Sequence, residues 1–356
     1  MINRRRILMG GLGLLAATLL PARAGRAEGE KRTELVILTW SDYLDPEVVK
    51  AFEARHPITV RQVHFDSDQA RDQQVVRKGS DAFDIMVVNA INLASYAHQK
   101  WLTPLDKGRL ANFTQLDPQW LAEAESGGRL LGLPYFWGNL GLAYREDLVH
   151  APPTSWMDFF RPAEPLRGHL NAIATNRELV GLALKALGHS VNTEDPAHLA
   201  EAEALLIQQK PHVTSYPYID IGKESPLITG EIKLAIVYNG DALKLREFDP
   251  RIRYVSPREG GAMWTDFLAM GTNPARREAT HAFLDFLNEP AMASKNAQFL
   301  HYATPNRGAL AMADPAYLAD PIVFPPEEVL RKSETIRPVA PRTQRKINEI
   351  MARLQR

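Results

Sequence analysis

The sequence of 356 residues contains no cysteine. Disulfide bonds, thiolate catalysis and cysteine-ligated metal sites are therefore excluded. The sequence also lacks an excess of either charge, with 42 basic and 42 acidic residues. Its first 27 residues hold five arginines and no acid, so 37 basic residues remain against 42 acidic ones in the rest. This mildly acidic balance argues against a surface that binds nucleic acids or anionic membranes.

Motifs of catalysis are absent as well. The sequence has no Gly-x-Ser-x-Gly elbow, no His-x-x-x-His pair with an acid, no phosphate-binding P-loop and no Gly-x-Gly-x-x-Gly after a strand. The ten histidines are scattered along the chain rather than grouped at the spacing of metal ligands. We therefore expect neither an enzyme nor a bound cofactor or metal ion.

The N-terminal segment 1–27 has the pattern of an export signal. Arg4-Arg5-Arg6 precedes an apolar run, 7–20, that is short for a membrane span, and Ala22-Arg23-Ala24 fits a cleavage site. Paired arginines before a glycine-bearing apolar run favour a twin-arginine signal over an ordinary secretory signal. Because there is no lipobox cysteine, we expect a protein released into the bacterial periplasm without a lipid anchor.

Residues 35–49 are typical of a strand, a loop and a helix. The apolar run 35–38 suits a strand buried on both faces of a parallel sheet. Asp45-Pro46-Glu47 fits the N-cap and first turn of a helix. The intervening loop holds two aromatic residues and an acid, Trp40, Tyr43 and Asp42. Open α/β sheets bind ligands at the carboxyl ends of their strands, and this combination suits an organic cation there.

Strands and helices alternate along the rest of the chain, which predicts an α/β protein. The expected helices span residues 46–56, 68–77, 176–186, 279–287 and 342–355, and the expected strands span 35–38, 58–65, 83–88 and 233–238. Two extended stretches, 131–144 and 258–270, look like passages from one sheet to another. Such a chain forms two α/β lobes with a cleft between them, an arrangement that can close like a hinge.

Aromatic residues recur at or near the ends of the expected strands, as Trp40 and Tyr238 show. Trp264 and Asp266 share one face of a later strand, because side chains alternate with a period of two. A buried carboxylate is costly without a partner, and a ligand ammonium would provide one. Cation–π contact would add roughly 0.5–2 kcal/mol per aromatic ring. The alternatives are core packing for the aromatic residues and a structural hydrogen bond for Asp266.

Six segments of the sequence carry a family resemblance. They are LTWSDYLDPE at 38–47, LPYFWG at 133–138, TSW at 154–156, YNGDA at 238–242, EGGAMWTD at 259–266 and YATPN at 302–306. In the same order, and over nearly all of the chain after the signal, they resemble motifs of the periplasmic spermidine/putrescine-binding proteins. These proteins are the solute receptors of polyamine importers of the ATP-binding-cassette (ABC) type.

The resemblance implies a type II periplasmic binding fold, with two α/β lobes joined by two crossing connections and a cleft that closes on a linear polyamine. We expect an N-terminal lobe of residues 28–136 and 262–310 and a C-terminal lobe of residues 137–261 and 311–356. The matching positions imply these ligand contacts: Trp40, Ser41, Tyr43, Glu178, Tyr238 (a tryptophan in the family), Trp264, Asp266 and Tyr302.

Three departures from the family pattern concern the ligand amines. Thr175 replaces an aspartate three residues before Glu178, and the two residues also form a capping box, so Glu178 serves either the ligand or the helix. Asn89-Ala90-Ile91 replaces a serine and a tyrosine after strand 83–88, which makes Asn89 a candidate contact. Ile336-Arg337 stands where the family has a ligand-contacting glutamine.

The expected function is capture of a polyamine and its delivery to the membrane permease of an ABC importer. Each desolvated ammonium needs an acceptor, so Asp266 with Glu178 suits a diamine such as putrescine better than spermidine. Asp42 is either a replacement acid or a solvated loop residue. The alternative function is a ligand-sensing partner of a membrane signalling receptor, with an altered amine or another cation as ligand. We expect a monomer and no nucleic-acid partner.

Overall fold

The computed structural model of the chain describes residues 32–354, and the export signal expected over residues 1–27 lies outside this range. The alternation of strands and helices expected from the sequence is confirmed. Within residues 32–354, no helix is both long enough and apolar enough to cross a membrane.

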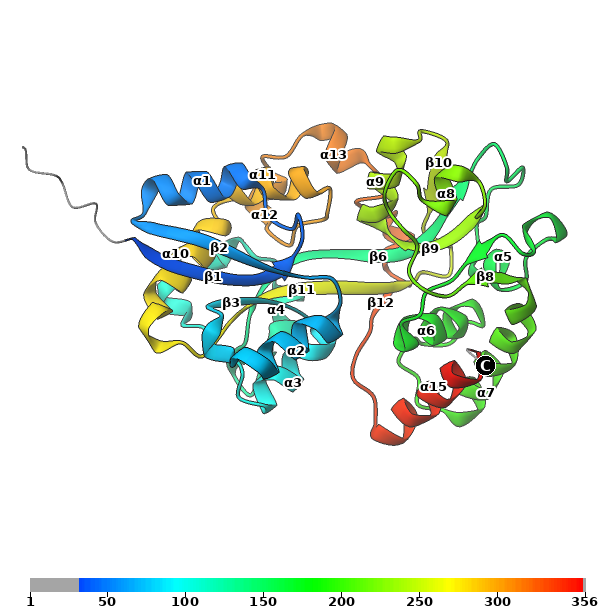
Figure 1. The fold of residues 1–356 in the computed structure, drawn as a ribbon, viewed down its shortest axis with the longest axis horizontal. Helices are drawn as coiled ribbons and strands as arrows, with labels where there is room; N and C mark the ends of the chain where they lie inside the picture. Colours follow the sequence, from blue (N-terminus) through cyan, green and yellow to red (C-terminus); the bar gives the residue numbers. More distant parts are fainter. Residues whose placement is uncertain (1–31, 355–356) are drawn as a thin grey trace, which may run out of the picture. The chain divides into compact units, whose positions relative to one another are not determined.

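A ten-stranded sheet runs through the described residues in the order β2-β1-β3-β11-β6-β9-β7-β8, with β10 beside β6 and β12 beside β11 (Figure 1). Its strands are β1 (Thr33–Trp40), β2 (Ile58–Phe65), β3 (Ile85–Asn89), β6 (Leu133–Arg145), β7 (Leu170–Asn171), β8 (Val213–Ser215), β9 (Leu234–Tyr238), β10 (Ile252–Val255), β11 (Ala262–Met270) and β12 (Glu334–Thr335). A separate pair consists of β4 (Glu125–Ser126) and β5 (Arg129–Leu130).

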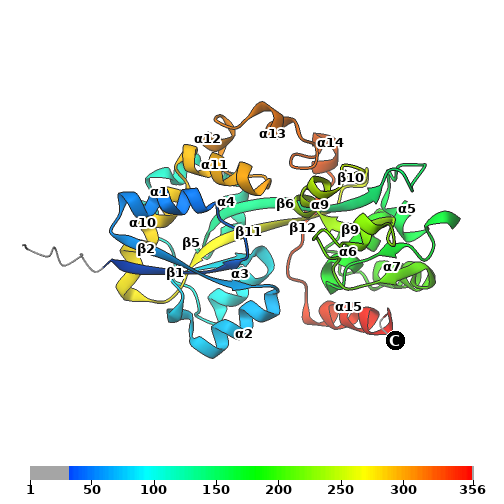
Figure 2. The ribbon, with the colours of Figure 1, turned by 45° about the horizontal axis from the view of Figure 1, so that its top comes forward.

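The α-helices accompany these strands (Figure 2). They are α1 (Pro46–Arg55), α2 (Asp68–Lys78), α3 (Ala90–His98), α4 (Pro118–Ala124), α5 (Trp156–Phe160), α6 (Asn176–Ala186), α7 (Pro196–Gln209), α8 (Pro226–Thr229), α9 (Asn239–Phe248), α10 (Arg277–Leu287), α11 (Pro290–Leu300), α12 (Arg307–Leu310), α13 (Pro315–Ala319), α14 (Glu327–Leu330) and α15 (Pro341–Leu354). The bounds expected for β2 and α6 are confirmed, whereas β10 and α11 were not expected.

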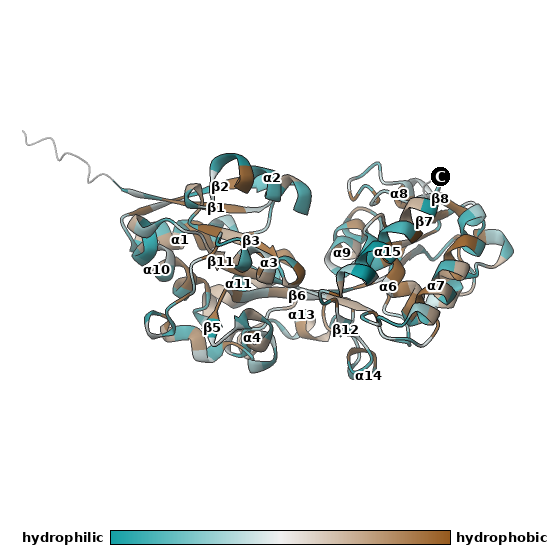
Figure 3. Cartoon of the chain, turned by 90° about the horizontal axis from the view of Figure 1, so that it is seen from below, coloured by the Kyte–Doolittle hydropathy of each residue, from teal (hydrophilic) through white to brown (hydrophobic). Residues whose placement is uncertain are grey.

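The opening strand, loop and helix form as expected. Residues 35–38 are buried in β1, which pairs in parallel with β2 and β3. The Asp45 side chain caps α1 by accepting a hydrogen bond of 2.7 Å from the backbone N–H of Glu47. α1 and α2 lie on opposite sides of β1 and β2 (Figure 1, and seen from below in Figure 3), so residues 35–38 are buried on both faces of the strand.

Two strands, β6 and β11, belong to two hydrophobic cores at once. Residues 133–137 of β6 lie in the first core and residues 140–144 lie among the cores of the second lobe. β11 lies beside β6 in an antiparallel register, with Met263 opposite Asn139. These are the two passages that the extended stretches predicted.

A third passage lies near the C-terminus, where β12 pairs in parallel with β11. Val323 is the last residue buried in the first core, Phe324 and Leu330 still pack against that core, and the chain enters the second core at Ile336. Tyr317 and Ile322 also lie in the first core, beyond the boundary at residue 310 that the sequence indicated.

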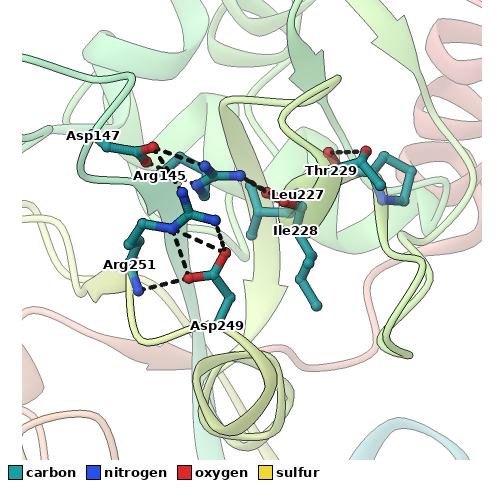
Figure 4. Close-up of polar contacts among 8 residues, drawn as sticks. Arg145, Asp147, Leu227, Ile228, Thr229, Asp249 and Arg251 are labelled. Carbon is teal, nitrogen blue, oxygen red and sulfur yellow. Dashed lines mark hydrogen bonds and ion pairs between the residues drawn. The ribbon is translucent and has the colours of Figure 1, made fainter.

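The end of β6 is anchored by Arg145, a residue that is 4% exposed (Figure 4). Its Nη1 atom donates to the carbonyl oxygens of Leu227 and Ile228 at 3.3 and 2.6 Å, close to the C-terminal end of α8. Its Nε and Nη2 atoms donate to the Asp147 carboxylate at 2.8 Å each. A cation at this end of a helix satisfies carbonyl groups that have no partner within the helix.

Candidate ligand-binding site

Four aromatic rings form a continuous series of contacts, called here the aromatic chain: Tyr43, Tyr302, Trp264 and Tyr238. Neighbouring ring centroids lie 5.8 Å apart for Tyr43 and Tyr302, 5.1 Å for Tyr302 and Trp264, and 6.3 Å for Trp264 and Tyr238. Edge-to-face contacts of this kind are favourable for aromatic pairs. Since Tyr43 belongs to the first core and Tyr238 packs against the second, the aromatic chain connects the two lobes.

Two glycines make the close packing of the aromatic chain possible. A Cβ atom on Gly240 would lie 2.0 Å from the ring of Tyr302, and a Cβ atom on Gly138 would lie 2.6 Å from the ring of Trp264. No side chain fits at such distances, so both positions require glycine if the rings are to stay where they are. The sequence motifs YNGDA and LPYFWG therefore include a steric requirement of this site.

Asp266 lies beside one end of the aromatic chain. It is 8% exposed, and its Oδ2 atom accepts a hydrogen bond of 2.9 Å from the Tyr43 hydroxyl. Burial raises the pKa of Asp266 to about 6, although hydrogen bonding to Tyr43 and Trp40 opposes part of this rise. A carboxylate in this setting gains stability from a cationic partner.

Glu178 lies beside the other end, in the first turn of α6. It is 9% exposed, and its Oε1 atom accepts a hydrogen bond of 2.8 Å from the Tyr238 hydroxyl. Its Oε2 atom is buried and forms no hydrogen bond of ordinary geometry with the described residues, although the Thr175 side chain lies close enough to lower the pKa of Glu178. Burial raises the pKa of Glu178 to about 7. The alternative role in a capping box is wrong, because the N-cap residue Thr175 forms no side-chain capping hydrogen bond.

A second unpartnered polar atom lies in the middle of the aromatic chain. The Nε1 atom of Trp264 is buried and has no hydrogen-bond partner among residues 32–354. Buried polar groups are nearly always hydrogen-bonded, so an orphan donor and an orphan acceptor in one cluster need an explanation. An ammonium ligand that enters the cluster would donate to the Glu178 oxygen, whereas the Trp264 N–H needs an acceptor, which an ammonium group does not offer.

Trp40 and Asn89, two further expected contacts, border this cluster. Trp40 packs against Phe65 with a centroid separation of 4.4 Å, and it also lowers the pKa of Asp266. Asn89 caps α3 by accepting a hydrogen bond from the backbone N–H of Asn92. Asn89 also lies opposite Asp266 in the register of β3 and β11.

Two other expected contacts, Ser41 and Asp42, lie between Trp40 and Tyr43 in the chain. Ser41 and Asp42 are exposed in a turn, and Asp42 has the left-handed backbone angle φ of 54°. No hydrogen bond connects either residue with the described residues of the aromatic chain. Arg337 is exposed and lines a pocket with Glu123 and Asn192, and that pocket includes no residue of the aromatic chain.

Sequence reasoning missed two acids near the aromatic chain, Asp241 and Asp68. Asp241 accepts a hydrogen bond of 2.5 Å from the Tyr218 hydroxyl, and burial raises its pKa, with Tyr302 as a further contact. It lies in the YNGDA segment, three residues after Tyr238, so helical spacing could have indicated it. Asp68 follows the carboxyl end of β2, next to that of β1, so the rule for ligand sites at strand ends could have indicated it.

Aromatic faces and buried acids define what the site can bind. A buried cation that acts on Asp266 is Arg71, whose charge is shared by the carboxylates of Asp68 and Asp72 at 2.7 and 3.2 Å. Among residues 32–354, no group of three potential ligands could hold a metal ion. The arrangement therefore suits an organic cation that offers hydrogen-bond donors to the carboxylates and apolar surface to the rings.

A family model described as bacterial extracellular solute-binding protein matches residues 47–325. The chain is 28% identical over 322 residues to the spermidine/putrescine-binding periplasmic protein of Escherichia coli strain K12, which covers 90% of this chain and 91% of that protein. It is 31% identical over 299 residues to the norspermidine sensor of Vibrio cholerae, which covers 83% of this chain and 82% of that protein.

A solved structure shows the same architecture. The spermidine/putrescine ABC transporter substrate-binding protein PotD from Streptococcus pneumoniae matches with a TM-score of 0.82 and 26% identity, covering 91% of this chain and 98% of that chain. The two-lobed type II periplasmic binding fold implied by the sequence motifs is therefore confirmed.

Proposed function

The chain belongs to the polyamine-binding family of bacterial extracellular solute-binding proteins, and from this premise we propose that it captures a linear polyamine between its lobes and delivers it to an ABC permease. Members of this family are substrate-binding proteins, not enzymes. The proposal places capture in the periplasm, after export through the twin-arginine route and without a lipid anchor.

The observation that carries the proposal is the pair of buried acids at the two ends of the aromatic chain. Asp266 and Glu178 each have one tyrosine hydroxyl as a neutral donor, and Glu178 keeps one buried oxygen without a partner. Two ammonium groups would neutralise these acids, while the methylene groups between them pack against the rings. On these two acids alone, a diamine such as putrescine is favoured over spermidine.

Hinge closure is the proposed means of capture, because the two acids come from different lobes. Asp266 lies in β11 within the first lobe, whereas Glu178 lies in α6 of the second. We propose lobes of 28–136 with 262–310 and of 137–261 with 311–356, except that residues 311–323 move with the first core. A ligand that contacts both acids then favours the closed arrangement.

Calorimetric titration of residues 28–356 with putrescine, cadaverine, spermidine and norspermidine tests the proposal directly. We expect at least one of these amines to bind, and we expect Asp266→Asn to abolish binding while the melting temperature without ligand stays near its original value. Glu203→Gln is the matched control, because Glu203 is also 8% exposed but lies in α7, among charges of α15. Absence of heat with every amine would refute the ligand assignment.

A second candidate function is that of a sensing partner for a membrane receptor. It is favoured by the 31% identity to a norspermidine sensor and by Thr175 and Asn89, which depart from the pattern of transport receptors. Neighbouring genes discriminate between the two functions. Permease and ATPase genes beside this one support transport, whereas a gene for a membrane cyclic-dinucleotide enzyme supports sensing.

A further inference from the structure

Asp68 is an acid that lies close to the aromatic chain but outside every motif recognised in the sequence. It occupies the first position of α2, directly after Ser67, whose hydroxyl caps the helix at 3.2 Å from the backbone nitrogen of Ala70. Acids at this position are stabilised by the positive end of the helix dipole. The Asp68 side chain therefore starts from a fixed position at the N-terminus of α2.

The Asp68 carboxylate is held by three side chains. Its Oδ1 atom accepts a hydrogen bond of 2.7 Å from Arg71, and its Oδ2 atom accepts bonds of 2.6 and 3.2 Å from the amides of Asn89 and Asn92. These contacts fix its direction, yet the side chain remains 42% exposed. Each carboxylate oxygen can accept more than one hydrogen bond, so Asp68 retains capacity for a further donor.

The position of Asp68 relates it to both ends of the aromatic chain. Asn89, which donates to Asp68, lies directly opposite Asp266 in the register of β3 and β11. The charge of Asp68 also contributes to the raised pKa values of Asp266 and of Glu178 in the other lobe. Asp68 is therefore one side chain away from Asp266, and its negative charge acts on both end acids.

The charges around Asp68 leave a deficit of cations. Arg71 is the buried cation of this cluster, and Asp72 and Asp68 share it at 3.2 and 2.7 Å. One positive charge thus faces two carboxylates, before Asp266 and Glu178 are counted. The buried, unpartnered Oε2 atom of Glu178 independently indicates that a ligand completes the cluster.

We propose that Asp68 accepts the middle ammonium of a linear triamine whose end ammonium groups meet Asp266 and Glu178. The inference rests on the proposed function and extends its ligand class from diamines to triamines. Asp68 replaces, from the first lobe, the acid that the second lobe lacks at Thr175. The preference for a diamine was argued from Asp266 and Glu178 alone. With Asp68 as a third acid, a triamine is favoured.

Two ligands of equal length isolate the middle charge. Norspermidine has a secondary ammonium at its centre, and 1,7-diaminoheptane has a methylene group in its place. We expect the wild-type chain to bind norspermidine at least tenfold more tightly, and Asp68→Asn to reduce that ratio to about one, because hydrogen bonds to charged groups carry roughly a tenfold to hundredfold effect. Putrescine affinity should change by less than about threefold in the variant.

Asp72→Asn is the matched control, because Asp72 contacts the same Arg71 and is also 42% exposed, but it accepts its other hydrogen bond from Tyr96 rather than from Asn89 and Asn92. The Asp72→Asn variant should keep the wild-type ratio of norspermidine affinity to 1,7-diaminoheptane affinity. If the wild-type chain binds norspermidine and 1,7-diaminoheptane equally well, Asp68 does not have the proposed role, and this result does not depend on whether Asp68→Asn folds. An equal loss of affinity for both ligands in Asp68→Asn would also contradict that role. Binding of putrescine with a ratio near one would leave the proposed function intact, whereas binding of no amine would refute both.

Discussion

Glu178 and Asp266 have pKa values of about 7 and about 6 because burial disfavours their charged forms. Without ligand, the folded chain therefore holds more protons than the unfolded chain between the ordinary carboxyl pKa, near 4, and neutrality. Stability then falls as the pH rises through this range, because the native state binds the extra protons. An ammonium ligand has the opposite effect on the two acids, because it favours their ionised forms over their protonated forms.

The resulting pH dependence is opposite for folding and for binding. We expect polyamine affinity to rise by roughly tenfold or more between pH 5.5 and pH 7.5, as Glu178 and Asp266 ionise. Over the same range we expect the melting temperature of the unliganded chain to fall. Titration calorimetry and thermal melts at both pH values check this. The Glu178→Gln variant should show a smaller change in both quantities; an unchanged pH profile in that variant would exclude Glu178 as the titrating group.

Residue-level reasoning from the sequence found Asp266 but missed Asp241 and Asp68, and it did not identify the partners of the acids. Asp266 and Trp264 were identified by strand alternation, and the structure brings them into one cluster. Thr175 and Glu178 fit a local capping rule, yet Glu178 bonds to Tyr238 instead, a residue 60 positions away in the chain. Local patterns cannot show which distant side chain competes for a carboxylate.

Helices and strands with strong local signals were predictable at the scale of single elements. The N-cap Asp45 and the apolar run 35–38 define the start of α1 and the interior of β1. In contrast, β10 has the sequence Ile-Arg-Tyr-Val and becomes a strand through antiparallel pairing with the end of β6. That pairing joins segments far apart in the sequence. The four residues of β10 alone therefore do not have a pattern strong enough to predict a strand.

Arg145 shows how one side chain stabilises the joint between β6 and α8. We expect Arg145→Met to lower the free energy of unfolding by about 3 kcal/mol, because it leaves the carbonyl oxygens of Leu227 and Ile228 without their donor and leaves Asp147 with the longer contact to Arg251 at 3.4 Å. Chemical denaturation measures the change. Arg253→Met in β10 is the control: Arg253 pairs with Glu146 at the surface, both about half exposed, and should cost under about 1 kcal/mol. Equal losses in the two variants would contradict the anchoring role.

At the scale of the whole molecule, two α/β lobes and their crossing segments were predictable because each passage carries glycine beside a long apolar stretch. The third passage at β12 was not, because two paired residues make no pattern that a sequence can show. The candidate site could not be fully predicted for the same reason. Asp68 lies near Asp266 because β2, β1 and β3 are neighbours in the sheet, and this strand order cannot be read from the sequence of one segment.

The sharing of β6 and β11 by both cores should make unfolding cooperative. We expect calorimetry of residues 28–356 to show one thermal transition whose calorimetric and van't Hoff enthalpies agree. A saturating polyamine should move this transition to higher temperature as one unit, by about 2.7 kcal/mol of added stability at a hundredfold excess over Kd. Two separate transitions would show that the lobes melt independently.

The continuous burial of β6 from Leu133 to Arg145 also limits how genes of this kind can recombine. If one lobe were exchanged between two relatives by a single recombination within β6, each core would contain one half of β6 from one parent and its neighbouring side chains from the other. A working chimera must take β6, β11 and the β12 passage from the same parent, or match their inward side chains position by position. Ligand preference should therefore diverge in this lineage by point substitution at the lobe interface more readily than by exchange of whole lobes.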